Sequence, residues 1–560
     1  MARISGRRTV GGGVAVLVTA ALGATAVGGV SSAPVQSRDV VRVESAANVA
    51  AAPVQAAGIP GLATTLDGIL TDARLSGATS RVVVRDANTG EVLYNRNGWV
   101  RGNPASTEKL LTSAAAMDLL GPTFRFATAV RRTGTLAGGR LTGNLYLRGS
   151  GDPTMLAADY DRLAVAVADA GITSVSGYLG VDDGAFDAVR LGPAWSWDNE
   201  PYAYSAQVSA LTIAPDADYD AGAVAVSLQP GALGRRPTVT FSPSSSRFVV
   251  DNRATTGAAG TANTLAVTRA HGANRFVVTG SVPLGSRAQR VLLSVWDPSF
   301  VAADVFRAAL ARRGVTFDGS PVLRRAASPA GSQVVALHAS APLSKLLVPF
   351  LKLSNNNHAE VLVKAIGRKR AGAGTWPAGT GAIRSWLAAN GVSTSAVRVS
   401  DGSGLSRTDL LTGTQVTNLL IAVRDKAWFS TWYGALPVAG QPARLVGGTL
   451  RLRMRGTAAA GNVHAKTGTL TSVSALSGYV TNAAGRRLVF SVMFDDLVTG
   501  GVKDLEDRVA VTLARSGAAA GTLAGAGADT GKVTPAPVVP DDPRTDVDES
   551  QLECSWVGAC

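Results

Sequence analysis

Cysteine is almost missing from this chain of 560 residues, because only Cys554 and Cys560 occur, both within the last seven positions. No disulfide framework and no cysteine metal site can therefore hold a core together. In an oxidising compartment the two thiols could close a small terminal loop, and a frayed tail with free thiols is the alternative. The fold must depend on apolar packing, for which 46% hydrophobic residues supply ample material.

Histidine and lysine are also scarce, with four and nine residues respectively. His271, His338, His358 and His464 show no ligand spacing, so we expect no metal and no cofactor. Arginine supplies most of the formal net charge of +14, which favours an anionic polymer such as a bacterial cell wall as partner. Nucleic acid is not an expected partner, because no basic cluster is interleaved with aromatic residues.

Long apolar runs are confined to the N-terminus. Residues 1–33 resemble an export signal, in which Arg3, Arg7 and Arg8 precede an apolar stretch over residues 10–30. An uncleaved membrane anchor is the alternative, because about 20 apolar residues can span a bilayer. In either case we expect an extracytoplasmic protein, secreted or associated with the cell envelope, which could attach peripherally to membrane or wall.

The chain between two low-complexity ends divides by composition. We expect an Ala/Val-rich linker over 34–59 and a disordered, partly acidic tail over 519–560. Short β-rich runs broken by Gly, Pro, Asn and Asp fill the middle of the chain. We therefore predict a principal domain over 60–125 and 336–518, an inserted β-rich domain over 126–150 and 231–335, and a second inserted domain over 151–230. One larger irregular β domain is the alternative for the insertion.

Periodicity predicts the elements of the principal domain. Apolar residues at helical spacing predict helices over 62–75, 106–120, 343–353, 358–370 and 505–514. Alternating β-rich runs joined by turn residues predict two hairpins, 81–85 with 91–94 and 472–480 with 487–494. Within the insertion the same criteria predict a helix over 160–170 and strands over 141–147, 223–228, 238–241 and 275–282.

Three short motifs stand at the ends of predicted elements. They are Ser106-Thr107-Glu108-Lys109 at a helix start, Ser354-Asn355-Asn356 between two helices, and Lys466-Thr467-Gly468 leading into a strand. Taken singly, each has an ordinary explanation as a helix cap, a polar turn or a strand entry. Their joint occurrence in this order, each on the element type that acyl transfer to a serine requires, predicts an enzyme.

The chemistry of these motifs is complementary. A serine hydroxyl is a poor nucleophile and needs a positioned base, and Lys109 shares a helical face with Ser106. A lysine can take the proton only when it is neutral, which burial or a nearby cation such as Lys466 favours. Backbone N–H groups at the helix start around Ser106 would face a developing oxyanion.

With these motifs the chain resembles the class C low-molecular-mass penicillin-binding proteins, which are D-alanyl-D-alanine carboxypeptidases and endopeptidases. The separation of 248 positions between Ser106 and Ser354 (354 − 106) is typical of this family, which carries inserted domains there. Further phrases match it: Arg148-Gly149-Ser150-Gly151-Asp152-Pro153, His358-Ala359-Glu360 and Asp401-Gly402-Ser403-Gly404-Leu405-Ser406-Arg407.

The resemblance implies an α/β (α+β) transpeptidase-like fold, in which an antiparallel sheet packs between helices and inserted β-rich domains split the sequence. It implies that Ser106 attacks the penultimate D-alanine of a peptidoglycan stem peptide, and that β-lactam antibiotics act as inhibitors. Lys109 would accept the proton, and Ser354 and Asn356 would relay it. The resemblance also implies that Lys466 and Thr467 hold the terminal carboxylate next to Gly468, and that the backbone N–H groups of Ser106 and Thr469 form the oxyanion hole.

The resemblance also points to a subsite for the stem-peptide side chain, formed by Arg407, Trp197 and Tyr204. The family has an acidic residue near the aromatic pair, whereas this sequence has Asn199 with Asp198 beside it. Packing within an inserted domain is the alternative role of these aromatic residues.

Two other functions share the same motifs. A β-lactamase would need a well-placed water and base for rapid deacylation, and the long insertion argues against it. The non-enzymatic alternative is a penicillin-binding sensor or wall-binding protein that acylates slowly or only scaffolds. The intact Ser106, Lys109 and Lys466 argue against a pure scaffold. The balance between carboxypeptidase and endopeptidase activity stays open.

Overall fold

The computed structural model describes residues 58–319, 322–498 and 500–517. The expected export signal, nearly all of the linker, the acidic tail and both cysteines lie outside these residues. Among the helices of the described part, none combines the length and the apolar character needed to cross a bilayer.

A five-stranded antiparallel sheet joins the two ends of the described chain. Its strand order is β2-β1-β22-β21-β20, formed by β1 (Thr79–Asp86), β2 (Val92–Arg96), β20 (His464–Leu470), β21 (Val473–Thr481) and β22 (Arg487–Asp495). Both predicted hairpins are confirmed. The expectation that Lys466 merely leads into a strand is wrong, because the lysine lies inside β20, which pairs along its length with β21.

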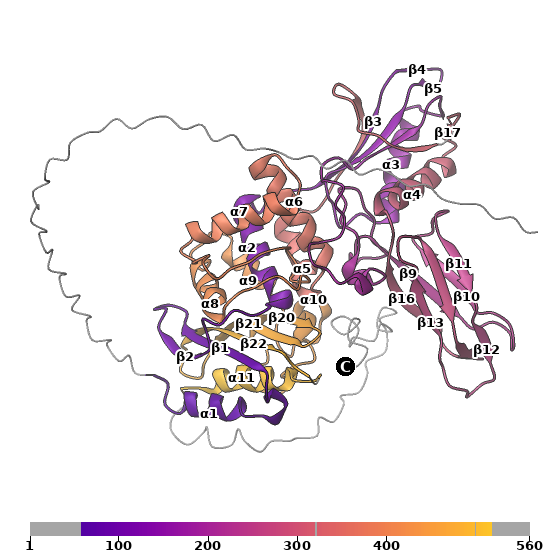
Figure 1. Cartoon of the computed structure of the whole chain (residues 1–560). Coiled ribbons are helices and arrows are strands. Elements are labelled where there is room, and N and C mark those ends of the chain that lie inside the picture. Colours follow the sequence, from indigo (N-terminus) through magenta and orange to yellow (C-terminus); the bar gives the residue numbers. More distant parts are fainter. Residues whose placement is uncertain (1–57, 320–321, 499, 518–560) are drawn as a thin grey trace, which may run out of the picture. The chain divides into compact units, whose positions relative to one another are not determined.

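Helices cover both faces of this sheet (Figure 1). On one face lie α1 (Leu62–Ile69) and α11 (Lys503–Arg515), and on the other α8 (Gly413–Ala422) packs against β1, β21 and β22. Leu505 is fully buried between α11 and the sheet, so its truncation to Ala would cost about 2–5 kcal/mol. The predicted fold of an antiparallel sheet between helices is confirmed.

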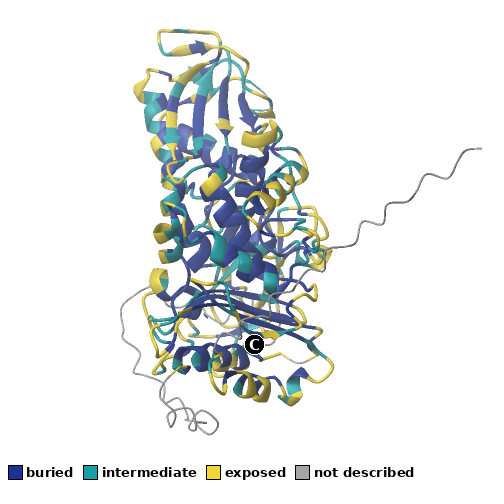
Figure 2. Ribbon diagram, turned by 90° about the vertical axis from the view of Figure 1, so that its left-hand side faces the viewer, coloured by how far each residue is buried: buried dark blue, intermediate teal, exposed yellow. Residues whose placement is uncertain are grey.

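A second layer of helices lies beyond α8. Its centre is α2 (Lys109–Leu119), which is buried over most of its length because Leu, Ala and Met side chains cover nearly every face. Around α2 pack α5 (Leu343–Lys352), α6 (Asn356–Ala371) and α7 (Trp376–Ala389), and the layer includes α9 (Phe429–Gly434) and the short α10 (Arg444–Gly447). Figure 2 shows that most residues of these helices and of the sheet are buried.

The insertion between α2 and α5 contains two further sheets that share one apolar core with two helices. One has the order β18-β8-β6-β3-β19 and the other β17-β7-β5-β4. Their strands are β3 (Ala127–Arg132), β4 (Thr135–Ala137), β5 (Arg140–Thr142), β6 (Leu145–Gly149), β7 (Ser174–Val175), β8 (Leu179–Asp182), β17 (Thr316–Phe317), β18 (Leu323–Arg325) and β19 (Gln333–Ala339). The helices are α3 (Ala157–Asp169) and α4 (Pro298–Arg312), which pack on each other.

Three smaller sheets lie within the insertion, in the orders β10-β9-β16, β11-β14-β13 and β12-β15. Their strands are β9 (Ala223–Gln229), β10 (Thr238–Ser242), β11 (Val249–Asn252), β12 (Thr255–Gly257), β13 (Ala266–Arg269), β14 (Arg275–Thr279), β15 (Ser281–Pro283) and β16 (Gln289–Ser294). The predicted strand over 275–282 is thus two strands, and that over 141–147 is divided between β5 and β6.

These pairings differ from the partition expected from the sequence. Strands β7 and β8 fall in the expected inner domain over 151–230, yet they pair in parallel with β5 and β6. Parallel neighbours need a crossover, and α3 supplies it. Buried residues of β9, β14 and β16 belong to the same apolar core as the two larger sheets, so no core boundary separates residues 223–294 from the rest of the insertion. The insertion ends with β19, after which α5 resumes the principal domain.

Candidate active site

Ser106 lies in a single 3₁₀ turn, η2 (Ala105–Glu108), which continues into α2 with Lys109 as its first residue. The predicted helix start is therefore a tighter turn, and its first residue, Ala105, has a left-handed φ of 44°. Asn103 Oδ1 accepts a hydrogen bond from Ala105 N at 2.9 Å, and Thr107 Oγ1 donates to Pro104 O at 2.6 Å. These local bonds hold the serine on a strained turn, a feature common at functional sites.

The side chain of Lys109 lies against the Ser106 hydroxyl. Lys109 Nζ is 2.7 Å from Ser106 Oγ, 2.7 Å from Asn356 Oδ1 and 2.9 Å from Ser403 O. An amide oxygen and a peptide carbonyl can only accept hydrogen bonds. A neutral Lys109 therefore donates to these two oxygens and turns its lone pair toward the serine proton, which is the geometry of a general base.

Asn356 is the first residue of α6, so its expected place on the connection is wrong, and the helix begins two positions before the predicted start at 358. Its Nδ2 donates to Tyr204 O at 2.8 Å. Because this carbonyl requires a donor, the amide cannot flip, and Oδ1 must face Lys109.

Ser354 and Lys466 form the second polar pair of the site. Lys466 Nζ donates to Ser354 Oγ at 2.8 Å and to Thr467 O at 2.8 Å. Ser354 has a left-handed φ of 62°, which a residue with a Cβ adopts only at a cost of about 1–2 kcal/mol. The structure thus brings together both members of this pair from elements far apart in the sequence.

Strand β20 lies directly beside the serine turn. A Cβ built on Gly468 would be 2.9 Å from Pro104 O and 3.1 Å from Ser106 N, so only glycine fits without displacement. Thr467 Oγ1 is 2.9 Å from Thr449 Oγ1. Thr469 follows on the same strand, and its Oγ1 is buried with no hydrogen-bond partner among the described residues.

Buried carboxyl groups lie close to Lys109. Burial raises the pKa of Glu360 to about 8, with a further rise from Asp401 and an opposing effect from hydrogen bonds with Ser403, Trp376 and Gly402. Burial and neighbouring carboxyl groups also raise the pKa values of Glu108 and Asp409 well above the ordinary range. At neutral pH these carboxyl groups therefore hold more protons than exposed ones would, which limits the negative charge around the base.

The structure divides the expected side-chain subsite. The backbone of Tyr204 is bonded to Asn356, and its ring packs against Ala105, Leu405, Leu470 and Val473. Arg407 Nη1 donates to Thr471 O at 2.8 Å. Trp197, in contrast, is 76% exposed and contacts His271 of the insertion in a tilted arrangement, with a ring-centroid distance of 4.9 Å. Tyr204 and Arg407 therefore border the site, whereas Trp197 forms an outer surface.

Asn199 stands where the family has an acidic residue, and both Asn199 and the neighbouring Asp198 interact with residues of the expected subsite. Tyr204 donates its hydroxyl hydrogen to Asn199 Oδ1 at 3.0 Å. Burial lowers the pKa of Arg407, while Asp198 and Asp495 oppose this effect. Asp198 is thus one of two acidic groups that act on Arg407, and Asn199 fixes the Tyr204 hydroxyl.

Sequence reasoning missed several contributors that act through the backbone or through short polar contacts. The carbonyl oxygens of Ser403 and Tyr204 belong to the backbone, so the amino-acid type does not mark them in the sequence. Thr449 is one threonine among many, and no spacing distinguishes it. Trp195 belongs to none of the sequence motifs, yet its Nε1 donates to Asp401 Oδ2 at 2.8 Å. Within the described residues, no group of three or more His, Cys, Asp or Glu side chains could hold a metal ion.

Comparison with known proteins matches nearly all of the described chain to one family. The model of the D-Ala-D-Ala carboxypeptidase 3 (S13) family matches residues 62–516. The chain is 44% identical over 515 residues to a D-alanyl-D-alanine carboxypeptidase of Actinomadura sp. (strain R39), a match that covers 92% of this chain and 93% of that protein.

Two solved structures are also similar. The crystal structure of penicillin binding protein 4 (dacB) from Haemophilus influenzae has a TM-score of 0.68 at 25% sequence identity, covering 80% of this chain and 97% of that one. The same protein complexed with a novel β-lactam has a TM-score of 0.64 at 24% identity, covering 81% and 98%.

Proposed function

This chain belongs to the D-Ala-D-Ala carboxypeptidase 3 (S13) family, and from that premise we propose that its acyl-enzyme forms on Ser106. It is an enzyme, a serine-type D-alanyl-D-alanine carboxypeptidase. One contact supports the assignment of roles: Lys109 Nζ lies 2.7 Å from Ser106 Oγ. Asn356 Oδ1 and Ser403 O can only accept hydrogen bonds, so they take the hydrogens of the neutral amine and leave its lone pair toward the serine.

In the acylation step Ser106 Oγ forms a bond to the carbonyl carbon of the penultimate D-alanine, and its proton passes to Lys109 Nζ. The backbone N–H groups of Ser106 and Thr469 bind the oxyanion, which the close approach of β20 to the serine turn supports. The C–N bond then breaks, and the leaving amine of the terminal D-alanine takes a proton through Ser354. Asn356 orients Lys109 and binds the substrate amide.

The terminal carboxylate binds to Lys466 and Thr467. Both side chains are buried on β20, next to Ser354 and Thr449, and a buried cation with a hydroxyl beside it is well suited to a carboxylate. Water then hydrolyses the ester on Ser106 and restores the free enzyme. Cleavage of crosslinks proceeds by the same steps wherever the released amino acid keeps a free carboxylate.

The natural substrate is a peptidoglycan stem peptide, and β-lactams acylate the same serine. An extracytoplasmic location follows from this substrate and from the expected export signal, with peripheral attachment to wall or membrane. Arg407 and Tyr204 receive the side chain of the stem peptide, and Trp197 contributes from the outer surface.

Release of D-alanine tests the proposal directly. We expect the purified chain to release D-alanine from a peptide that ends in D-Ala-D-Ala and to leave the matched peptide ending in D-Ala-L-Ala intact. Ser106→Ala should abolish the release. Release by the alanine variant at the wild-type rate would contradict the assignment of the nucleophile, and rapid turnover of penicillin would favour a β-lactamase.

A further inference from the structure

Helix α6 carries a polar stripe along one buried face. Asn356, Glu360 and Lys364 are spaced four residues apart, so their side chains lie one above the other on the helix. All three are buried. Asn356 contacts Lys109 directly. The proposed mechanism gives no role to Glu360 or Lys364.

Glu360 binds the backbone of residues 402–403, and Ser403 O of this loop is the second oxygen that accepts a hydrogen bond from Lys109. Its Oε1 accepts from Ser403 N at 2.8 Å, and its Oε2 accepts from Gly402 N at 3.1 Å and from Trp376 Nε1 at 2.7 Å. The carbonyl oxygen of Ser403 is the group that receives Lys109 Nζ at 2.9 Å. Glu360 thus fixes the peptide units on which the position of the base depends.

We propose that Glu360 is a positioning residue for Lys109, acting through the 402–403 peptide and sharing α6 with Asn356. The proposal rests on the proposed function, since it assigns Lys109 as the base. Asn356 Oδ1 and Ser403 O are the two oxygens that must take the hydrogens of the neutral amine if its lone pair is to face Ser106. One helix therefore controls both oxygens, the first by its own side chain and the second through Glu360.

The stripe continues beyond Glu360 into the insertion. Lys364 Nζ lies 3.7 Å from the centroid of the Trp376 ring, whose Nε1 is bonded to Glu360. The same ammonium donates to Asp187 Oδ1 at 2.5 Å and to Val189 O at 2.6 Å. Trp376 is thus held on both sides, by Glu360 at its nitrogen and by Lys364 over its ring.

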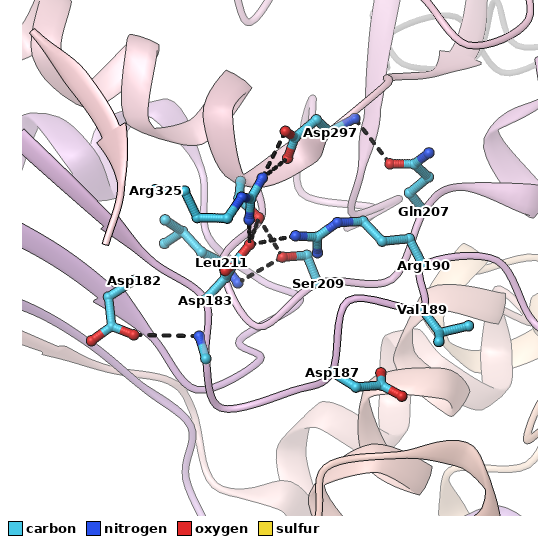
Figure 3. Close-up of polar contacts among 12 residues, drawn as sticks. Asp182, Asp183, Asp187, Val189, Arg190, Gln207, Ser209, Leu211, Asp297 and Arg325 are labelled. Carbon is cyan, nitrogen blue, oxygen red and sulfur yellow. Dashed lines mark hydrogen bonds and ion pairs between the residues drawn. The ribbon is translucent and has the colours of Figure 1, made fainter. Parts of the chain in front are cut away.

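Asp187 and Val189 belong to a segment of the insertion that is itself fixed by ion pairs. Figure 3 shows this segment with Arg190, which pairs with Asp183, and with Arg325, which pairs with both Asp183 and Asp297. A continuous series of polar contacts thus holds the loop at Ser403. It runs from the inserted segment through Lys364 and Trp376 to Glu360.

Glu108 is the other buried carboxyl group close to Lys109, and it is not equivalent. Its two carboxyl oxygens have no hydrogen-bond partner among the described residues, whereas those of Glu360 are bonded to three N–H groups. Removal of Glu360 would leave two peptide N–H groups buried without partners and free the loop to rotate.

Acylation kinetics separate positioning from folding. We compare wild type, Glu360→Ala, Glu360→Gln and Trp376→Phe in stopped-flow acylation by a chromogenic penicillin, with the dissociation constant of the non-covalent complex and the first-order acylation constant determined separately. Asp304→Ala is the matched control, because Asp304 is a buried carboxylate that also closes a loop by accepting a backbone bond, from Ser246 N at 2.7 Å, in the inserted domain.

We expect Glu360→Ala to lower the acylation constant roughly 100-fold with little change in the dissociation constant, since a displacement near 1 Å has this effect. Glu360→Gln, which keeps an acceptor oxygen, should recover most of the loss. Trp376→Phe should fall between the two, and Asp304→Ala should acylate at the wild-type rate. A wild-type rate in Glu360→Ala, or equal losses in the Ala and Gln variants, would overturn the inference. A wild-type chain that is not acylated would overturn the proposed function and the inference with it.

Discussion

The Ser354 hydroxyl and the Lys466 ammonium lie 2.8 Å apart, although 112 positions separate the two residues in the chain. Ser354 reaches this position only with a left-handed backbone, at φ 62°. A strained residue persists where surrounding contacts determine its conformation, and the contact with β20 is one of them. The strain is therefore part of the arrangement to which the proposed mechanism assigns binding and protonation of the substrate.

Replacement of Ser354 should separate stability from activity. Ser354→Ala and Ser354→Gly both remove the hydroxyl and should both slow acylation. Glycine tolerates the left-handed conformation, so the Gly variant should be more stable than the Ala variant, by about 1 kcal/mol. Urea unfolding followed by circular dichroism measures the difference. Equal stability of the two variants would show that the backbone at 354 is not strained.

Gly468→Ala should impair acylation by crowding the serine turn. The added Cβ would meet Pro104 O at 2.9 Å and Ser106 N at 3.1 Å, and backbone atoms cannot move aside easily. We expect the acylation constant to fall roughly tenfold or more. Gly434→Ala in α9 is the control, because a Cβ there meets nothing within 4 Å. If both variants acylate alike, β20 does not lie against the nucleophile as described.

Asn356→Asp should damage the base while preserving the shape of the side chain. The Asp side chain has no hydrogen to donate to Tyr204 O, and a carboxylate beside Lys109 favours the charged lysine, which lacks a lone pair. Acylation should therefore be slow near neutral pH and recover as the pH is raised. A pH profile of the acylation constant tests this. A uniform loss at every pH would indicate misfolding of the site instead.

His358 should make the protein sensitive to acid. Burial lowers its pKa from 6.5 to about 4, so the unfolded chain binds a proton at this residue before the folded chain does. Stability from this source is present above pH 6.5 and is lost as the pH falls from there toward 4. His358→Gln keeps a donor for Tyr219 O, which His358 Nε2 contacts at 3.1 Å, and removes the titration.

Urea unfolding over this pH range measures the effect. The loss of stability on acidification should be smaller in His358→Gln than in wild type. An identical pH dependence in the two proteins would show that His358 titrates normally in the folded state.

Contacts between residues close together in the chain could be predicted from the sequence, whereas contacts between distant residues could not. Ser106 and Lys109 are three positions apart, so helical geometry alone pairs them. Strand β20 was not recognised as a strand of its own, because its pairing with β21 leaves no separate turn signature beyond Ser472, whose φ is 63°. The role of Ser403 could not be predicted, because a carbonyl oxygen occurs in every residue.

The partition of the insertion shows the same limit. The alternation of short β-rich runs was visible, but parallel pairs such as β6 with β8 are joined across α3. Sequence neighbours give no indication of such pairs, since a crossover separates strands that lie side by side. The predicted division at 151 therefore cut through one continuous sheet.

Mass spectrometry of the penicillin-treated protein tests the central claim most directly. The wild-type chain should gain the mass of one penicilloyl group, peptide mapping should place it on Ser106, and Ser106→Ala should gain nothing. Ser113→Ala, which alters another buried serine in α2, should still be labelled at Ser106. An adduct on a different residue, or an unchanged adduct in Ser106→Ala, would contradict the account.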